Sequence, residues 1–483
     1  MRQLIARIEE LAQLYPDREC LACPEHSLSY SDFVSRLEAT RAELEQLAIS
    51  RLGIYANNSA EWAIIDLAAS MAGLVVVPIP LFFSSGQIQH LVDNAALDGL
   101  YTDRRFPLAV GDGRPSKVLA GRYIAVTKNT PDQRPHYCKV TYTSGSTGHP
   151  KGACLKDETM MSIVTSLADA LLPSQLGRHL SLLPFATLLE NVAGIYLSLW
   201  MGRSVVIDDP ANLGLASNHQ FDPKLFASKV DASSAESVIL LPQMLKLIIE
   251  ADISEQLRSL KFIAVGGGKV APELLRRAQE LKLPVFEGYG LTECGSCVAL
   301  NTPSANRIGS VGKPLPHAQV RIGTSGEVFV TGAAMEGYLQ DDPAPSEIST
   351  GDAGFLDPEG FLHITGRIKN VIVSSYGRNI SPEWVESHFL ADARIQQMAV
   401  FGEAQPHLSA VFVAPDSLQD KELSALIEQV NATLPDYARV MSWTRSQAPF
   451  SLESETLTSN GKIRRDMVAK QFFAAASGSA VAA

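Results

Sequence analysis

The sequence lacks an unbroken apolar run long enough to cross a membrane. Its most apolar stretch, residues 62–83, contains Asp66, Gly73 and two prolines, so it predicts a buried helix followed by a buried strand. Residues 1–13 mix charged and apolar side chains, which predicts an amphipathic helix rather than the apolar core of a signal peptide. We therefore expect a cytoplasmic protein without a transmembrane segment, with peripheral membrane contact left open.

The sequence also lacks an excess of basic residues. Its 41 Lys and Arg face 52 Asp and Glu, which gives a formal net charge of −11. This balance argues against nucleic acid as a partner, although a local basic site can still bind ATP. A length of 483 residues predicts two or three domains rather than a single core.

Cysteine is scarce, with six in the chain, but two C-x-x-C spacings occur, Cys20/Cys23 and Cys294/Cys297. A structural zinc site needs four ligands gathered at one point. Cys20 and Cys23 fall in a predicted strand, where positions three apart face opposite sides. We therefore predict reduced thiols and no zinc centre.

The chain does contain a loop that is rich in glycine and hydroxyl groups. Residues 142–152 read YTSGSTGHPKG and lie between two predicted strands, residues 138–142 and 152–155. Backbone N–H groups freed by glycine, the Ser and Thr hydroxyls and the Lys151 ammonium together suit a polyphosphate. The pattern is not a Walker loop, because a proline and a glycine stand where that loop needs a glycine and a hydroxyl. Taken alone, the pattern would favour a surface turn.

A second stretch, residues 287–293, reads EGYGLTE. Tyr289 offers an aromatic face for adenine, and Thr292 offers a hydroxyl for a phosphate. Glu293 would place a carboxylate near a polyphosphate, which requires a cation between them, and Mg2+ prefers such oxygen ligands. Taken alone, Glu293 would favour a solvated loop acid.

These two stretches and three later ones resemble, in order, the motifs of the adenylate-forming (AMP-binding) superfamily, which includes the acyl-CoA synthetases. The later stretches are residues 350–354 (TGDAG), 366–370 (GRIKN) and 460–463 (NGKI). One such motif is weak evidence, but five in the right order across nearly the whole chain are strong evidence.

The resemblance implies an α/β fold with two domains. The first is a large N-terminal domain of layered α/β sheets with a small β subdomain, residues 1–366. A hinge at residues 367–370 leads to a small mobile α+β C-terminal domain, residues 371–483. We expect the tail from residue 474 to be disordered, because it is small and low in complexity.

The resemblance also implies the reaction. ATP would convert a carboxylic acid into an acyl-adenylate and pyrophosphate, and the acyl group would then pass to the thiol of CoA. ATP and CoA would be cosubstrates and Mg2+ the cofactor, and rotation of the C-terminal domain would separate the two steps. An acyl carrier protein is the alternative acceptor, and an aryl-CoA ligase is the alternative branch.

The resemblance assigns roles to individual residues of this sequence. Catalytic roles would fall to Lys462, Thr292, Glu293 and Arg367, with Glu293 as the metal ligand. The nucleotide would contact Thr143, Ser144, Gly145, Ser146, Thr147, Gly148, Lys151, Gly267, Gly268, Glu287, Gly288, Tyr289, Arg367 and Asp352, the last of which we expect in a tight turn. The acid pocket would be lined by Phe185, Ala186, Thr187 and Gly290, while Lys369 would be the hinge and Tyr376 and Gly377 would give the thiol access.

Residues 184–190 (PFATLLE) resemble the long-chain branch of the superfamily and predict a medium- or long-chain fatty acid. The chain departs from many relatives at Thr187, where they carry a histidine. Amino-acid-activating relatives place an aspartate about where Phe185 stands. A buried ammonium without a counter-charge is costly, so we do not expect an α-amino acid as substrate.

One segment admits a different interpretation. Gly266, Gly268 and Ala271 form G-x-G-x-x-A, and Glu287 follows about twenty residues later, which is the outline of a dinucleotide fingerprint. It would make the chain an NAD-linked oxidoreductase, although a lone fingerprint is weak evidence. The resemblance instead places this segment beside adenine, and Lys269 within it receives no role. A further alternative is a binding protein that keeps the fold without catalysis.

Overall fold

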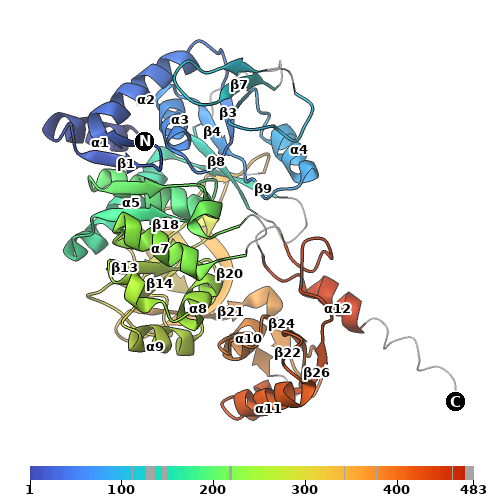
Figure 1. The fold of residues 1–483 in the computed structure, drawn as a ribbon. Helices are drawn as coiled ribbons and strands as arrows, with labels where there is room; N and C mark the ends of the chain where they lie inside the picture. The colour runs from blue at the N-terminus through green and yellow to red at the C-terminus, as the bar shows by residue number, and fades with distance from the viewer. Residues whose placement is uncertain are drawn as a thin grey trace.

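The computed structural model describes residues 1–110, 113–126, 136–143, 150–216, 220–341, 343–375, 378–458 and 461–473. Figure 1 shows a large body, coloured blue to yellow, and a smaller C-terminal body, coloured orange to red, which lies beside α8 (Pro242–Glu250). The predicted α/β fold class, with a large and a small domain, is confirmed. We call residues 1–366 the large module and residues from 371 onward the C-terminal module. None of the helices in the described part of the chain combines the length and apolar character needed to cross a bilayer.

A first sheet, ordered β19-β9-β8-β4-β3-β5-β7-β6, is built mainly from residues 51–155. Its helix α3 is buried along most of its length and begins where the Ser59 hydroxyl accepts the Trp62 N–H. The buried helix and the buried strand predicted within residues 62–83 are confirmed as α3 and β4. The elements are β3 (Arg51–Tyr55), α3 (Ala60–Met71), β4 (Val75–Pro78), α4 (Ser85–Asn94), β5 (Gly99–Thr102), β6 (Arg114–Pro115), β7 (Arg122–Ala125), β8 (Lys139–Thr143), β9 (Lys151–Leu155) and β19 (Gly337–Tyr338).

A second sheet, ordered β16-β15-β14-β13-β12-β10-β11-β1-β2, forms the other layer of the large module. Its central strands pair in parallel and are apolar, as expected for a sheet covered by helices. The strands are β1 (Glu19–Ala22), β2 (Ser27–Ser29), β10 (Arg178–Ser181), β11 (Ser204–Ile207), β12 (Ser237–Leu240), β13 (Phe262–Val265), β14 (Val285–Tyr289), β15 (Ala299–Leu300) and β16 (Lys313–Pro314). The helices are α1 (Arg2–Leu14), α2 (Tyr30–Leu44), α5 (Asp157–Leu171), α6 (Leu197–Trp200), α7 (Pro223–Ser233), α8 and α9 (Pro272–Glu280).

The predicted small β subdomain is an antiparallel sheet ordered β17-β18-β20-β21. The predicted tight turn at Asp352 is wrong, because this residue lies within the long strand β20 and pairs directly with Arg367 of β21. Gly351 has a φ of +68°, so its glycine marks an irregular position inside a strand and not a chain reversal. The strands are β17 (Ala318–Ile322), β18 (Glu327–Gly332), β20 (Glu347–Leu356) and β21 (Leu362–Arg367).

The C-terminal module has its own apolar core, centred on Val385, Phe389 and Phe412. Its first helix, α10, begins at Pro382 with Ser381 as its cap. The elements are β22 (Ile372–Val373), β23 (Asn379–Ile380), α10 (Pro382–Leu390), β24 (Gln397–Phe401), β25 (Leu408–Val413), α11 (Asp420–Asn431), β26 (Val440–Arg445) and α12 (Arg465–Phe473). The predicted disordered tail from residue 474 lies outside the described residues.

Candidate active site

The glycine-rich loop joins two paired strands, as predicted. β8 and β9 are antiparallel, and Thr143 pairs with Lys151 across the hairpin. Ser144, Gly145, Ser146, Thr147 and Gly148 lie outside the described residues. Thr143 is half-buried at the end of β8, whereas Lys151 is exposed at the start of β9. The hairpin thus fixes both ends of the loop where β8 ends and β9 begins.

The short strand β19 brings a residue to this hairpin that the sequence did not predict. Tyr338 pairs with Ala153 of β9, and its hydroxyl donates to Oε1 of Glu293. The Lys151 ammonium lies 5.0 Å from the centre of the Tyr338 ring and 3.6 Å from a carboxylate oxygen of Asp341. Burial, followed by the bond to Glu293, raises the pKa of Tyr338. The loop lysine and the predicted metal ligand are therefore linked through one tyrosine.

Glu293 lies in the short 3-10 helix that begins at Thr292, directly after the predicted adenine-stacking segment. Its backbone carbonyl accepts the Met335 N–H at 2.8 Å, which fixes the segment against the chain leading into β19. In the described part of the chain, no three His, Cys, Asp or Glu side chains gather as a metal site. A single carboxylate fits Mg2+, which in phosphate sites takes one or two protein ligands and completes its shell with phosphate and water.

Tyr289, Asp352 and Arg367 form one contiguous group. The Tyr289 hydroxyl donates to Oδ2 of Asp352 at 2.6 Å, and Nε of Arg367 lies 2.9 Å from Oδ1 of the same carboxylate. Arg367 also donates to the carbonyl of Thr350 at 2.9 Å. Burial raises the pKa of Asp352, and the charge of Arg367 is the largest effect that opposes the rise. Both carboxylate oxygens are thus fixed in direction by neighbours from two strands.

Lys462 enters this site from the C-terminal module. It lies in a tight turn, where the Thr458 N–H donates to the Lys462 carbonyl at 2.7 Å and the Lys462 N–H to the Thr458 hydroxyl at 3.1 Å. Loss of hydration, followed by the charge of Arg367, lowers the pKa of Lys462, while Asp352 and Glu293 raise it. The predicted catalytic residues Glu293 and Arg367 are therefore close enough to Lys462 for their charges to affect its pKa.

The turn carrying Lys462 is anchored three residues later. Arg465 forms ion pairs with Glu383 at 3.2 Å and with Glu386, both on α10. Glu386 is buried and also accepts the Val400 N–H at 2.8 Å. The turn that carries Lys462 is therefore attached to α10 by a half-buried arginine.

The segment after β13 lies against the strand that leads to Tyr289. A Cβ atom on Gly266 would stand 3.4 Å from the carbonyl of Gly288, and Gly267 has a φ of +80°. Gly268 lies at the same turn, beside Pro242. The turn that carries the predicted adenine-lining residues Gly267 and Gly268 therefore lies beside Gly288 of β14.

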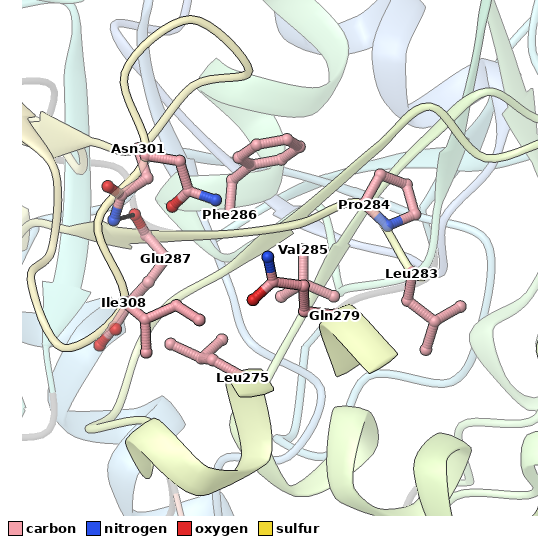
Figure 2. A pocket seen from close by; sticks show the side chains of 10 residues that line it. Leu275, Gln279, Leu283, Pro284, Val285, Phe286, Glu287, Asn301 and Ile308 are labelled. Carbon is pink, nitrogen blue, oxygen red and sulfur yellow. Dashed lines mark hydrogen bonds between the residues drawn. The ribbon is translucent and has the colours of Figure 1, made fainter. Parts of the chain in front are cut away.

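The charges of Glu287 and Lys269, near this turn, influence each other. Burial raises the pKa of Glu287 to about 8, and Lys269 is the largest opposing influence. The Lys269 ammonium donates to the carbonyls of Ile364 and Thr365, each at 3.1 Å, so it ties the turn to β21. Figure 2 shows Glu287 at the wall of a small pocket shared with Leu275 of α9. Lys269 thus has a structural partner that the sequence did not reveal.

The predicted acid pocket begins at a buried segment after β10. Phe185 is buried with its ring edge-on to Trp62 at 5.4 Å, and its N–H donates to Asn58 at 2.8 Å. The Thr187 hydroxyl donates to the Pro184 carbonyl at 2.6 Å, so its polar group is used within the segment. Ala186 between them is half-buried.

Gly290 admits no side chain, because a Cβ atom would stand 1.7 Å from the Ser296 carbonyl. The segment after Thr187 continues into a π-helix, Glu190–Tyr196, a form that is frequent at functional sites. Within it, the buried Glu190 carboxylate lies 2.9 Å from Nε2 of His179.

A fully buried ion pair underlies the phosphate-loop hairpin. Lys139 of β8 donates to both oxygens of Asp66 at 2.8 and 3.1 Å, and also to Asn191 and Tyr196. Both charged side chains are 1% exposed. Sequence reasoning missed this pair, although a lysine inside an apolar strand and an aspartate inside an apolar helix were visible signals.

Lys369 lies in the short 3-10 helix Ile368–Asn370 between the modules and is exposed. Asn370 next to it donates to Glu383 at the start of α10. The predicted thiol-access residues Tyr376 and Gly377 lie outside the described residues.

Comparison with known proteins gives consistent matches over most of the chain. A family model described as AMP-binding enzyme matches residues 8–339, and one described as AMP-binding enzyme C-terminal domain matches residues 369–476. A long-chain-fatty-acid–CoA ligase of Mycobacterium bovis is 24% identical over 87% of this chain and 86% of that protein. A 2-succinylbenzoate–CoA ligase of Bacillus licheniformis is 24% identical over 87% of this chain and 92% of that protein.

A solved structure with the same fold is the o-succinylbenzoate CoA synthetase of Bacillus subtilis in complex with its acyl-adenylate intermediate. It has a TM-score of 0.77 at 22% identity and covers 96% of this chain and 97% of that one. The same synthetase in complex with ATP and magnesium has a TM-score of 0.75, also at 22% identity, over 95% and 98% of the two chains.

Proposed function

The chain belongs to the AMP-binding enzyme family, as an AMP-forming acyl-CoA synthetase, and from this premise we propose that it activates a carboxylic acid with ATP and transfers the acyl group to CoA. One observation carries the proposal. Lys462 comes from the C-terminal module, yet its charge interacts with Asp352, Arg367 and Glu293 of the large module. Side chains from both modules thus influence one another electrostatically, and we assign Lys462 as the cation, Glu293 as the metal ligand and Asp352 as the ribose ligand of one site.

In the first step, an oxygen of the acid carboxylate attacks the α-phosphorus of ATP. The bond from that phosphorus to the bridging oxygen breaks, and pyrophosphate leaves. Lys462, a point charge on a long stem, would neutralise the carboxylate and the α-phosphate as negative charge develops. Asp352 would accept the ribose hydroxyls, and Tyr289, held by its bond to Asp352, would stack on adenine.

The pyrophosphate would be held by the loop that starts at Thr143 and ends at Lys151. Glu293 would hold Mg2+, which supplies positive charge to the phosphates when it is bound. Tyr338 orients that carboxylate through its hydroxyl. The magnesium complex of the Bacillus subtilis synthetase, which shares this fold, supports the choice of metal.

In the second step, the thiol sulfur attacks the acyl carbonyl carbon and the bond from that carbon to the phosphate oxygen breaks. AMP leaves with the bonding electrons, and the thiol proton is released to water. Lys462 has no role in this step, and a bulky thiol needs its own access route. We propose that the C-terminal module rotates about Lys369, which is exposed between the modules. CoA is the proposed acceptor rather than an acyl carrier protein, because the relatives compared above are named CoA ligases.

For the acid, we propose a medium- or long-chain fatty acid, on the likeness of residues 184–190 to the long-chain branch and on the fatty-acid ligase of Mycobacterium bovis. The succinylbenzoate ligases favour an aryl acid as the second candidate. The NAD-linked alternative is not retained, because the AMP-binding match covers residues 8–339 and includes the Gly266–Gly268 turn.

Acid-dependent exchange of labelled pyrophosphate into ATP, run over a panel of fatty and aryl acids, tests the function and ranks the substrates. Lys462→Met should lower exchange roughly 100- to 1000-fold, because it removes one group that stabilises the transition state. It should leave thiolysis of isolated acyl-adenylate within about 3-fold of the natural protein, since no step there uses that charge. Lys470→Met on the exposed part of α12 is the control. Absence of exchange with every acid would refute the proposal.

A further inference from the structure

The reaction outlined above leaves one lysine at the junction of the modules without a role. Lys246 lies on α8 of the large module, and its side chain is only 15% exposed. Its ammonium donates to the carbonyl of Asp392 at 3.0 Å and to the carbonyl of Ile395 at 2.7 Å. Both acceptors belong to the C-terminal module. Lys246 therefore connects the two modules directly.

The two carbonyls stand at a site that favours a cation. Asp392 and Ile395 lie in the turn that comes after α10, which ends at Leu390, so both carbonyls are near the negative end of the helix dipole. The segment is itself well ordered by hydrogen bonds, because the Ile395 N–H donates to the Asp392 carbonyl at 3.1 Å. The Asp392 carboxylate is paired with Arg394 at 2.9 Å. The ammonium thus meets a preformed pair of acceptors.

Packing supports the same junction. Ala391 of the C-terminal module packs against the apolar cluster of the large module that contains Leu245 and Ile248 of α8. At the other end of α10, Ser381 lies so close to Gly366 that a Cβ atom there would stand 2.1 Å from its hydroxyl. The helix α10 is therefore held against the large module at both ends.

The contact between Lys246 and the C-terminal module affects the position of Lys462 through helix α10. Arg465 fixes the turn of Lys462 to Glu383 and Glu386 of the same helix. Holding α10 against α8 therefore also fixes the position of the turn that carries Lys462. Loss of hydration lowers the pKa of Lys246, and Glu250 and Asp392 raise it, so the charge of this ammonium depends on partners at the junction.

We propose that Lys246 is a positioning residue, a latch that holds the C-terminal module in the arrangement for acyl-adenylate formation. The inference rests on the proposed function, because only a two-step ligase needs this arrangement to form and then to open. Release of the two carbonyls would free the module to rotate for thiol transfer. The latch therefore favours the first step over the second.

The test compares Lys246→Met, which keeps the length of the stem but removes the donors, with Lys246→Arg, which keeps donors. Lys261→Met is the matched control, since Lys261 pairs with Glu236 inside the large module at 2.9 Å. A donor dye and an acceptor dye, attached to unnatural amino acids at the exposed positions Leu172 and Met441, report the separation of the modules without substrate. Exchange and thiolysis of isolated acyl-adenylate are measured on the same variants.

Losing both charged hydrogen bonds should change the ratio of docked to undocked modules about ten-fold in Lys246→Met. The rate of pyrophosphate exchange should then fall by about two-fold to ten-fold, while the rate of thiolysis of isolated acyl-adenylate should not fall. Lys246→Arg and Lys261→Met should match the natural protein in all three measurements. The inference is overturned if the dye distances in Lys246→Met are unchanged, or if both half-reactions fall equally. If the natural protein shows no exchange at all, the proposed function fails, and the dye distances still test the latch.

Discussion

The link between Tyr338 and Glu293 yields a prediction about magnesium. Tyr338→Phe removes only the hydroxyl that donates to the Glu293 carboxylate. The phenylalanine ring still offers a face to the Lys151 ammonium, which lies 5.0 Å from the centre of the tyrosine ring. The substitution therefore separates the orientation of the proposed metal ligand from the support of the loop lysine.

The expected size follows from the kind of contact that is lost. Removing a group that orients a metal ligand typically costs about 10- to 100-fold in metal affinity. Tyr338 and Glu293 are both only half-buried, so water can replace part of the lost bond and the lower end of that range applies. We expect the magnesium concentration for half-maximal exchange to rise about 10-fold, or about 1.4 kcal/mol, while the rate at saturating magnesium changes little.

The assay is acid-dependent pyrophosphate exchange over a magnesium titration at saturating ATP. Tyr289→Phe is the matched comparison, because it removes a phenol that donates to Asp352 at 2.6 Å rather than to Glu293. It should weaken ATP binding and leave the magnesium midpoint unchanged. An unchanged midpoint in Tyr338→Phe, or an equal shift in Tyr289→Phe, would refute the reasoning.

Two further predictions concern buried charges. Lys139→Met should lower the free energy of unfolding, measured in urea, by about 3–5 kcal/mol, because it leaves the Asp66 carboxylate buried without its cation. Adding Asp66→Asn to this variant should restore much of the lost stability. A loss under about 1 kcal/mol in Lys139→Met would contradict this reasoning. Glu287, whose pKa rises from 4.5 to about 8 on folding, must ionise at a cost in the folded state. Its contribution to stability is therefore complete below about pH 4.5 and is lost as the pH rises through about 8, by up to about 5 kcal/mol. Glu287→Gln should flatten this part of the pH dependence of unfolding, and an identical profile for both proteins would show that the carboxyl is not responsible.

Elements whose signal is local could be predicted from the sequence. The buried helix at residues 60–71 follows from an apolar composition behind a serine cap, and the start of α10 follows from Ser381 and Pro382. The motifs identified Asp352 and Arg367 as ribose-side residues. They did not reveal that both residues lie in paired β-strands. A glycine before an aspartate commonly indicates a turn, and only the pairing of β20 with β21 makes it part of a strand.

Other parts of the site depend on contacts between segments far apart in the chain. Tyr338 reaches Glu293 because β19 pairs with β9, almost two hundred residues earlier, and no local pattern encodes that pairing. Lys246 and Lys269 likewise bind backbone carbonyls, which every residue possesses. Because any residue type can supply such a carbonyl, the sequence does not indicate which residue accepts the hydrogen bond.

Because Lys246 binds backbone carbonyls, C-terminal modules from different proteins could replace one another at this contact. Because the latch recognises main-chain oxygens at a helix end, the side chains of the exchanged part need not change with it. A chimera that joins residues 1–366 of this protein to the C-terminal module of a distant relative should keep the junction wherever the first helix of that module has the same length as α10. Substrate choice and thiol choice could then be recombined as separate parts.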